Sequence, residues 1–311
     1  MKKLFLTILI GCLITNSVYS QVGTNFTTSD YWKGQRKEFF FGVGVTNFLG
    51  DLGGLDRIGT DYSFIDLEWA TTRPSGHIGY RYRLKPWIAT KTILQYGMLM
   101  GSDRLTNEPA RRNRNLSFKT HLVELSQHLE FIIYNNEHYG KRHQIRGLKG
   151  MRNKNTLVYL FSGITGFLYM PMAQGGPFLR PLHTEGQGLP GGPEPYGLFS
   201  WGIPFGTGVK IGLDRIWRIS FELSYTKTFT DYLDDVSSVY YDNAAIEAAY
   251  GAEAAYWADP SNGPFDTWTA PGEMRGDSKH KDAYFFFNIS LVRNLQQAKS
   301  KKIKWKYRAR F

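Results

Sequence analysis

The sequence predicts an all-β protein, an eight-stranded antiparallel β-barrel of the outer membrane with long extracellular loops and a basic periplasmic C-terminal tail. Three observations indicate this fold class. Eight segments alternate between apolar and polar side chains, as strands do. The 311 residues include 21 Phe, 19 Tyr, 8 Trp and 33 Gly, a composition typical of barrels and sandwiches. The connections between the segments alternate between short and long, as in outer-membrane barrels.

Residues 1–20 have the organisation of a secretory signal peptide, with two lysines, an apolar run and a cleavage motif that ends at Ser20. The apolar run is too short to cross a bilayer as a helix. An alternative is a lipobox that ends at Cys12, which would then carry the lipid. Cleavage after Ser20 removes this single cysteine, and the mature chain then has no disulfide, thiolate metal site or cysteine nucleophile.

We expect the chain to have four parts: the signal peptide at 1–20, a periplasmic segment at 21–37, the barrel at 38–295 and the tail at 296–311. Within the barrel, the segments of strand character are 38–48, 76–84, 87–101, 117–134, 156–170, 200–213, 217–232 and 283–295. Several reach the roughly 9–11 residues that a membrane strand needs. They are longer than the usual soluble strand of about 5–6 residues.

The loops between the segments also carry information. Residues 85–86 and 214–216 are short connections, whereas long loops follow the first, third, fifth and seventh segments. This asymmetry places both termini in the periplasm, although the connection at 135–155 is long for a periplasmic turn. The Gly- and Pro-rich loop at 172–197 is expected to be irregular, and residues 244–257 have helix-forming composition.

The formal net charge of +11 is concentrated in a few places. Two lysines of the signal peptide and seven basic residues of the tail account for nine of these charges. With an export signal present, this local basicity does not indicate a nucleic-acid partner.

The tail ends in KKIKWKYRARF, in which basic and apolar residues alternate strictly from Lys302 onward. Three interpretations stay open: strand addition to a periplasmic protein, attraction to anionic lipid headgroups, and a disordered basic tail. A ninth barrel strand is rejected because it would leave the C-terminus outside. The candidate partner-binding residues are Lys302, Lys304, Trp305, Lys306, Tyr307, Arg308, Arg310 and Phe311.

Charged side chains on the polar faces of the strands are expected inside the barrel. They are Arg81, Arg83, Glu124, Glu130, Lys210 and Glu222. Eight strands enclose only enough room for their own side chains, and unpaired buried charge is costly. We therefore expect these groups to pair across a packed interior. A pore that passes a small solute is the alternative.

One strand holds the groups of a hydrolase triad, namely Ser126, His128 and either Glu124 or Glu130. Alternate residues on a strand lie about 7 Å apart, which is too far for a Ser–His hydrogen bond. We expect no catalytic residue, and the scattered histidines predict no metal site and no cofactor.

Two stretches resemble a known family. They are FFFGVGVTNFLGDLGG at 39–54, which contains Gly50 and Asp51, and FTDYLDDVSSVYYD at 229–242, which contains Asp234 and Asp235. Together they resemble the PorG-like outer-membrane barrel proteins of Bacteroidetes, which belong to the type IX secretion and gliding machinery. The Gly and Asp residues by themselves suit turns and loop packing, and they have too few ligands for a calcium site.

The resemblance implies an integral barrel that is tied to a periplasmic ring of lipoprotein and partner subunits. It implies no catalysis, and we expect no small-molecule substrate. Among the interpretations of the tail, it favours the protein partner. A small-solute transport barrel and a lipid-modifying barrel enzyme remain as alternative functions.

Overall fold

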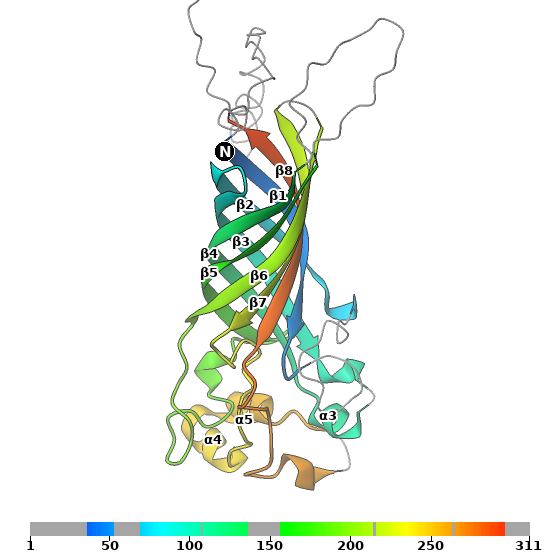
Figure 1. Cartoon of the computed structure of the whole chain (residues 1–311). Helices are drawn as coiled ribbons and strands as arrows, with labels where there is room; N and C mark the ends of the chain where they lie inside the picture. The colour runs from blue at the N-terminus through cyan, green and yellow to red at the C-terminus, as the bar shows by residue number, and fades with distance from the viewer. Residues whose placement is uncertain are drawn as a thin grey trace, which may run out of the picture.

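The computed structural model describes residues 36–52, 69–106, 108–135, 156–213, 216–262 and 265–295. Eight antiparallel strands close into a barrel in which each strand lies between its neighbours in sequence (Figure 1). The strands are β1 Lys37–Leu49, β2 Arg73–Lys85, β3 Ile88–Ser102, β4 Ser117–Asn135, β5 Thr156–Ala173, β6 Phe199–Gly212, β7 Trp217–Thr228 and β8 Ala283–Asn294. The predicted eight-stranded antiparallel barrel is confirmed.

Alternating side chains give the barrel an apolar outer surface and a polar interior. Every strand contributes large apolar side chains to the outside, among them Val43, Ile78, Leu94, Leu125, Ile164, Ile203, Leu223 and Ile289. Such a surface is stable against hydrocarbon and unfavourable in water. No helix among the described residues is long and apolar enough to cross a membrane.

Some predicted strand boundaries are wrong. β7 ends at Thr228 and not at residue 232, because the regular register with β8 is lost there: Asp282 accepts from the Thr228 amide, while its own amide donates to the Thr230 carbonyl. β2 begins three residues early and includes Pro74, which pairs with β1 but lies beyond the paired part of β3. A proline is tolerated there because no ladder hydrogen bond to β3 is lost.

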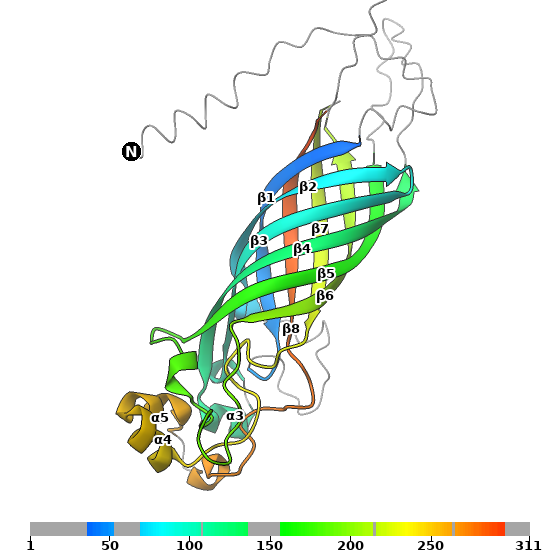
Figure 2. The same ribbon diagram turned by 90° about the vertical axis from the view of Figure 1, so that its left-hand side faces the viewer.

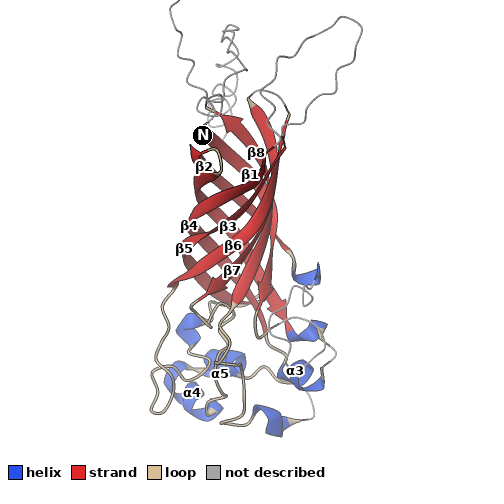
Figure 3. Cartoon of the chain, in the orientation of Figure 1, coloured by secondary structure: helices blue, strands red, loops and turns tan. Residues whose placement is uncertain are grey.

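Both β1 and β8 have their terminal ends at one end of the barrel, and the helices gather at the other end (Figures 1 and 2). The helical elements are η2 Trp69–Thr71, η3 Asp103–Leu105, α3 Pro109–Arg114, η4 Arg180–Leu182, α4 Asn243–Tyr250, α5 Ala252–Ala258 and η5 Asp266–Thr269. Figure 3 shows that these elements belong to the loops. We call this end the outer cap.

The outer cap is packed onto the mouth of the barrel. A buried cluster joins inward side chains of the strands, such as Phe118 and Phe286, to loop residues such as Leu52 and Leu233. The predicted helical segment 244–257 forms two helices, because Gly251 has a φ of +95° between α4 and α5. The loop at 172–197 is largely irregular, as expected, apart from η4.

Candidate functional site in the barrel lumen and outer cap

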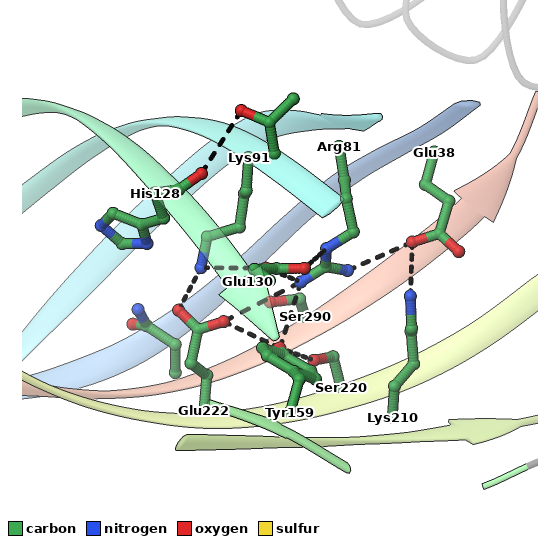
Figure 4. Close-up of polar contacts among 12 residues, drawn as sticks. Glu38, Arg81, Lys91, His128, Glu130, Tyr159, Lys210, Ser220, Glu222 and Ser290 are labelled. Carbon is green, nitrogen blue, oxygen red and sulfur yellow. Dashed lines mark hydrogen bonds and ion pairs between the residues drawn. The ribbon is translucent and has the colours of Figure 1, made fainter. Parts of the chain in front are cut away.

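The centre of the lumen is occupied by Arg81 of β2, whose guanidinium reaches several carboxylates (Figure 4). Its Nε atom lies 2.7 Å from Glu130 Oε2, and its Nη1 atom lies 3.2 Å from Glu38 Oε2. Its Nη2 atom also donates to the hydroxyl of Tyr159 at 3.1 Å. A guanidinium is suited to this place because its planar donors bond several acceptors at once.

A second cation, Lys91 of β3, lies on the other side of the same network. Its Nζ atom is 2.5 Å from Glu222 Oε1, 3.8 Å from Glu130 Oε1 and 4.6 Å from the centre of the Phe161 ring. The hydroxyl of Tyr159 donates to the other oxygen of Glu222 at 2.8 Å. The two carboxylates are therefore shared between Lys91 and Arg81.

The network extends toward the periplasmic end through Glu38 of β1. Its carboxylate is 2.6 Å from Lys210 Nζ and 3.6 Å from Arg218 Nη1. All these groups are buried, and Lys91 is only 1% exposed. Because β1 to β7 all contribute side chains at this level, the lumen is filled by ion pairs and carries no open passage here.

Further hydrogen bonds fill the lumen nearer the outer cap. Gln95 and Asn288 bond each other through their amide groups at 3.1 and 3.2 Å. The ring of His77 lies 2.7 Å from the Ser290 hydroxyl. These hydrogen bonds join β2 and β3 to β8 across the lumen.

Of the six charged residues that the sequence predicted for the lumen, four belong to this network and two do not. It brings Arg81, Glu130, Lys210 and Glu222 into the network above. Glu124 lies apart from these ion pairs and accepts hydrogen bonds from the hydroxyls of Tyr284 and Ser126. Arg83 lies at the periplasmic turn, where it donates to the Pro86 carbonyl at 2.7 Å.

Sequence reasoning missed three members of the network, Glu38, Lys91 and Arg218. Lys91 and Arg218 occupy inward positions of alternating strands, so the same pattern that indicated Lys210 could have found them. Glu38 stands at the beginning of a segment, where the alternation has not yet started. Its inward direction follows only from its pairing opposite Arg81 and Asn294.

The groups of the triad on β4 do not assemble into a catalytic arrangement. Ser126 Oγ donates to Thr165 Oγ1 at 2.7 Å, and neither ring nitrogen of His128 has a hydrogen-bond partner. The His128 ring instead stacks on Phe161, with ring centres 4.7 Å apart. Nucleophilic catalysis needs a base within hydrogen-bond reach of the hydroxyl, and this geometry does not provide one.

The two motif loops of the sequence meet in the outer cap. Asp235, in the left-handed region with a φ of 65°, accepts hydrogen bonds from the hydroxyls of Thr184, at 2.6 Å, and Tyr196. Burial raises the pKa of Asp235 to about 6. Asp234 is also buried, with one carboxylate oxygen bonded to the Val236 amide at 3.0 Å. Both carboxylates therefore hold the loop rather than facing solvent.

The first motif loop joins the same region. Asp51 Oδ2 accepts from the Asp277 amide at 2.7 Å, and the Asp51 carbonyl accepts from Arg114 at 3.1 Å. Gly50 leaves the space that the Phe48 ring and the Asp282 carboxylate occupy. These contacts join the first motif loop to the segment 275–282 that precedes β8.

Four carboxylates crowd the outer mouth of the barrel: those of Asp51, Asp231, Asp234 and Asp282. Burial raises the pKa of each of them, for Asp231 to about 6, and repulsion from neighbouring carboxylates adds to this effect. Within the described ranges, no three His, Cys, Asp or Glu side chains form a group that could hold a metal ion. Because their pKa values are raised, these carboxyl groups bind protons more readily, which reduces the repulsion among them.

The predicted partner-binding residues of the tail lie outside the described residues, which end at 295. Their proposed role therefore stays a prediction from the sequence. The same is true of the signal peptide and of the periplasmic connection at 136–155.

No family model and no curated protein matches the chain. Three solved structures align with most of it. One is Ail, the attachment invasion locus protein of Yersinia pestis, in complex with the heparin analogue sucrose octasulfate. It is 7% identical to this chain, the TM-score is 0.34, and the alignment covers 83% of this chain and 98% of that chain. Another is Neisserial surface protein A, with 8% identity, a TM-score of 0.34, and coverage of 82% and 96%. The third is outer membrane protein AlkL in DMPC bilayers, with 11% identity, a TM-score of 0.32, and coverage of 91% and 97%.

The closed barrel and its apolar outer surface indicate where the protein resides in the cell. A closed barrel has no free sheet edge, and its apolar outer surface needs a hydrocarbon environment. The strands, of 12 to 19 residues, are long enough to cross a bilayer. The protein is an integral β-barrel of the outer membrane, in which β1 begins and β8 ends at the same end of the barrel.

Proposed function

We propose that the protein is a non-catalytic component of a type IX secretion or gliding complex, in which the barrel anchors a periplasmic ring of lipoprotein and partner subunits to the outer membrane. The observation that carries the anchoring role is the filled lumen, in which Arg81, Lys91 and Glu222 are buried and paired. A barrel without a passage is suited to holding other proteins in place.

The assignment to this machinery rests on the sequence resemblance of the two motif loops at 39–54 and 229–242. Its contact with the ring is assigned to the basic tail at 296–311. Alternating basic and aromatic residues suit strand addition, in which backbone hydrogen bonds provide affinity and alternate side chains provide specificity. Outer-membrane lipid surrounds the barrel itself.

The test is an affinity purification from detergent-solubilised outer membranes, in which the full chain is compared with a version that ends at Leu295. We expect periplasmic ring proteins to co-purify with the full chain and to be lost with the truncation. A matched variant keeps the tail but replaces Trp305 and Tyr307 by serine, which retains the charge. If this variant retains the partners, the aromatic side chains of Trp305 and Tyr307 are not required for the contact. If the full chain purifies alone, the anchoring role is wrong.

The alternative of a solute-transport barrel is tested with purified protein in planar bilayers. A filled lumen predicts no steady conductance above that of the bare membrane. The enzyme alternative would require activity against lipid or ester substrates that is lost in Ser126→Ala or His128→Ala. Stable conductance or such an activity would replace the anchoring proposal.

A further inference from the structure

The outer surface of the barrel carries a polar patch on β3, β4 and β5. Thr92, Gln127 and Ser162 are exposed on this surface, and Thr90 beside them is half-buried. Thr92 lies opposite Gln127, while Leu129, the next outward residue of β4, lies opposite both Thr90 and Ser162. These four polar residues of three adjacent strands therefore form one continuous patch, which we call the wall patch.

The wall patch lies at the depth of the lipid tails. On β4, Gln127 is midway between His121, toward the outer cap, and Tyr134, toward the opposite end of the barrel. The ring of His121 lies 2.7 Å from the hydroxyl of the exposed Tyr96, and Tyr134 is exposed as well. Aromatic side chains of this kind mark the two membrane–water interfaces of a barrel. Gln127 is therefore placed near the middle of the hydrocarbon layer.

The opposite wall of the barrel is apolar at this level. In the described parts of β1, β2, β7 and β8, the outward positions between the interfaces hold apolar or aromatic side chains, such as Phe41, Ile78, Leu223 and Ile289. Hydrocarbon offers no hydrogen bonds, so polar groups that face lipid tails cost free energy. The confinement of such groups to β3, β4 and β5 favours a protein neighbour on this side.

The Gln127 amide is fixed in direction and still has bonding capacity. Its Oε1 atom accepts from the Thr92 hydroxyl at 2.6 Å, and its Nε2 atom donates to the Thr90 hydroxyl at 2.5 Å. The Thr90 hydroxyl itself donates to the His128 carbonyl at 3.4 Å. A primary amide has two donor hydrogens and two acceptor positions. These contacts use one of each, and one donor and one acceptor position remain for a group outside the chain.

The residues around Gln127 suit close approach of another membrane protein. Ser162 and Gly166, both outward on β5, are small, and small residues let the backbones of membrane-spanning elements come close to each other. Beside them, Leu125 and Ile164 are 59% and 62% exposed and provide apolar contact. A polar centre, small residues and an apolar rim together are typical of contacts within a membrane.

We propose that the wall patch is the contact surface of a homodimer, in which β3, β4 and β5 of two copies face each other across a two-fold axis along the membrane normal. Such an axis keeps every residue at its own depth, so the two Gln127 side chains meet. An amide is both donor and acceptor and can bond its own copy twice. A second copy therefore supplies the polar group that the patch requires at this depth. The inference does not depend on the anchoring role.

The first measurement is sedimentation equilibrium of the protein, purified from outer membranes, in density-matched detergent. We expect a dimer. Gln127→Leu should raise its dissociation constant by about tenfold, because the two-fold axis removes two amide hydrogen bonds at once. Leucine suits a lipid-facing position, so the variant should unfold at the same temperature as the native protein. Leu223→Ala, on the opposite wall at β7, is the control and should leave dimerisation unchanged.

The second measurement is cross-linking in the outer membrane itself. Ser162→Cys with a short bis-maleimide should give a covalent dimer, whereas Leu223→Cys should not. Cys12, the single native cysteine, lies in the predicted signal peptide. The proposal is overturned if the native protein is monomeric in both measurements, or if Gln127→Leu dimerises as tightly as the native protein. It is also overturned if Ser162→Cys is linked only to a different membrane protein.

Discussion

The Nζ atom of Lys91 lies 2.5 Å from Oε1 of Glu222 in the middle of the barrel. The two residues come from β3 and β7, which are not neighbours in the sheet, so this pair crosses the lumen. Tyr159 and Arg81 complete the surroundings of Glu222. A pair that spans the lumen both closes the passage and ties opposite walls together.

Removing one partner of this pair is expected to be strongly destabilising. Glu222→Gln leaves Lys91 without its shortest ion pair in a buried setting, which should cost about 3–5 kcal/mol. The free energy of unfolding is measured by urea titration of the protein in detergent. The temperature at which the folded barrel loses its altered mobility in gel electrophoresis provides a second measure.

The double variant Lys91→Met with Glu222→Leu is the control for this prediction. Replacing a buried pair by apolar side chains of similar size is often neutral, so the double variant should recover most of the loss. If each single variant is as stable as the native protein, Lys91 and Glu222 are not coupled across the lumen.

Glycine at position 208 is expected to be required for the same network. Gly208 on β6 lies between Tyr159 on β5 and Glu222 on β7, and a Cβ atom there would collide with the Tyr159 ring. Gly208→Ala should therefore move the ring and lower stability by about 1–3 kcal/mol. Gly76→Ala, with open space around the added carbon, should change stability little. Equal unfolding midpoints for both variants would contradict this argument.

The stability of the outer cap is expected to fall as the pH rises. Folding raises the pKa of Asp235 to about 6 and also raises that of Asp234. Since the unfolded chain loses these protons near pH 4, the native state binds more protons between about pH 4 and pH 6 and loses stability over this interval. Thermal unfolding followed by tryptophan fluorescence should give a lower midpoint at pH 8 than at pH 5.

Asp234→Asn should reduce this pH dependence. One carboxylate oxygen of Asp234 has no partner, and the other accepts from the Val236 amide, a bond that Asn can keep. Removing the charge should raise the midpoint at pH 8 by about 2–4 °C. The argument fails if the variant has a lower unfolding midpoint than the native protein at pH 8, or if the midpoint changes with pH as steeply as in the native protein. Either result would show that charge repulsion at Asp234 is not important.

Arg114 is expected to hold the cap loops to one another. Its Nε atom lies 2.8 Å from Asp103, and its other nitrogens donate to the carbonyls of Asp51 and Arg275. The three donors of a lysine ammonium lie on a single nitrogen, so they cannot span all three groups as the wider guanidinium fork does. Arg114→Lys should therefore speed limited proteolysis of the loop at 229–282 severalfold, whereas Arg112→Lys at an exposed position should not. If the Arg114→Lys variant is cleaved at the same rate as the native protein, Arg114 does not hold the cap loops together.

The strands were predictable because their signal is local. Each strand alternates with a period of two, so its inward and outward faces can be assigned without knowledge of its neighbours. This predicted the eight strands and the inward direction of Arg81, Glu130 and Lys210. The ends were less certain, because the end of β7 depends on where Asp282 lies, more than fifty residues away.

The partners inside the lumen required the tertiary structure. Lys91 and Glu222 are 131 residues apart, and Lys210 and Glu38 are 172 apart. Alternation shows that such groups face inward, but only the closed register decides which of them meet. Strand spacing alone predicted that Ser126 and His128 form no catalytic pair, but only the barrel shows that Ser126 bonds Thr165 and that His128 stacks on Phe161.

By itself, the sequence determined the eight antiparallel strands, their two faces and the location of the chain in the outer membrane, since these depend on local periodicity and on the solvent that each face requires. Only the tertiary structure decided which charges pair and that the acidic motif loops are buried. These features arise from long-range contacts, and no local pattern of residues specifies them.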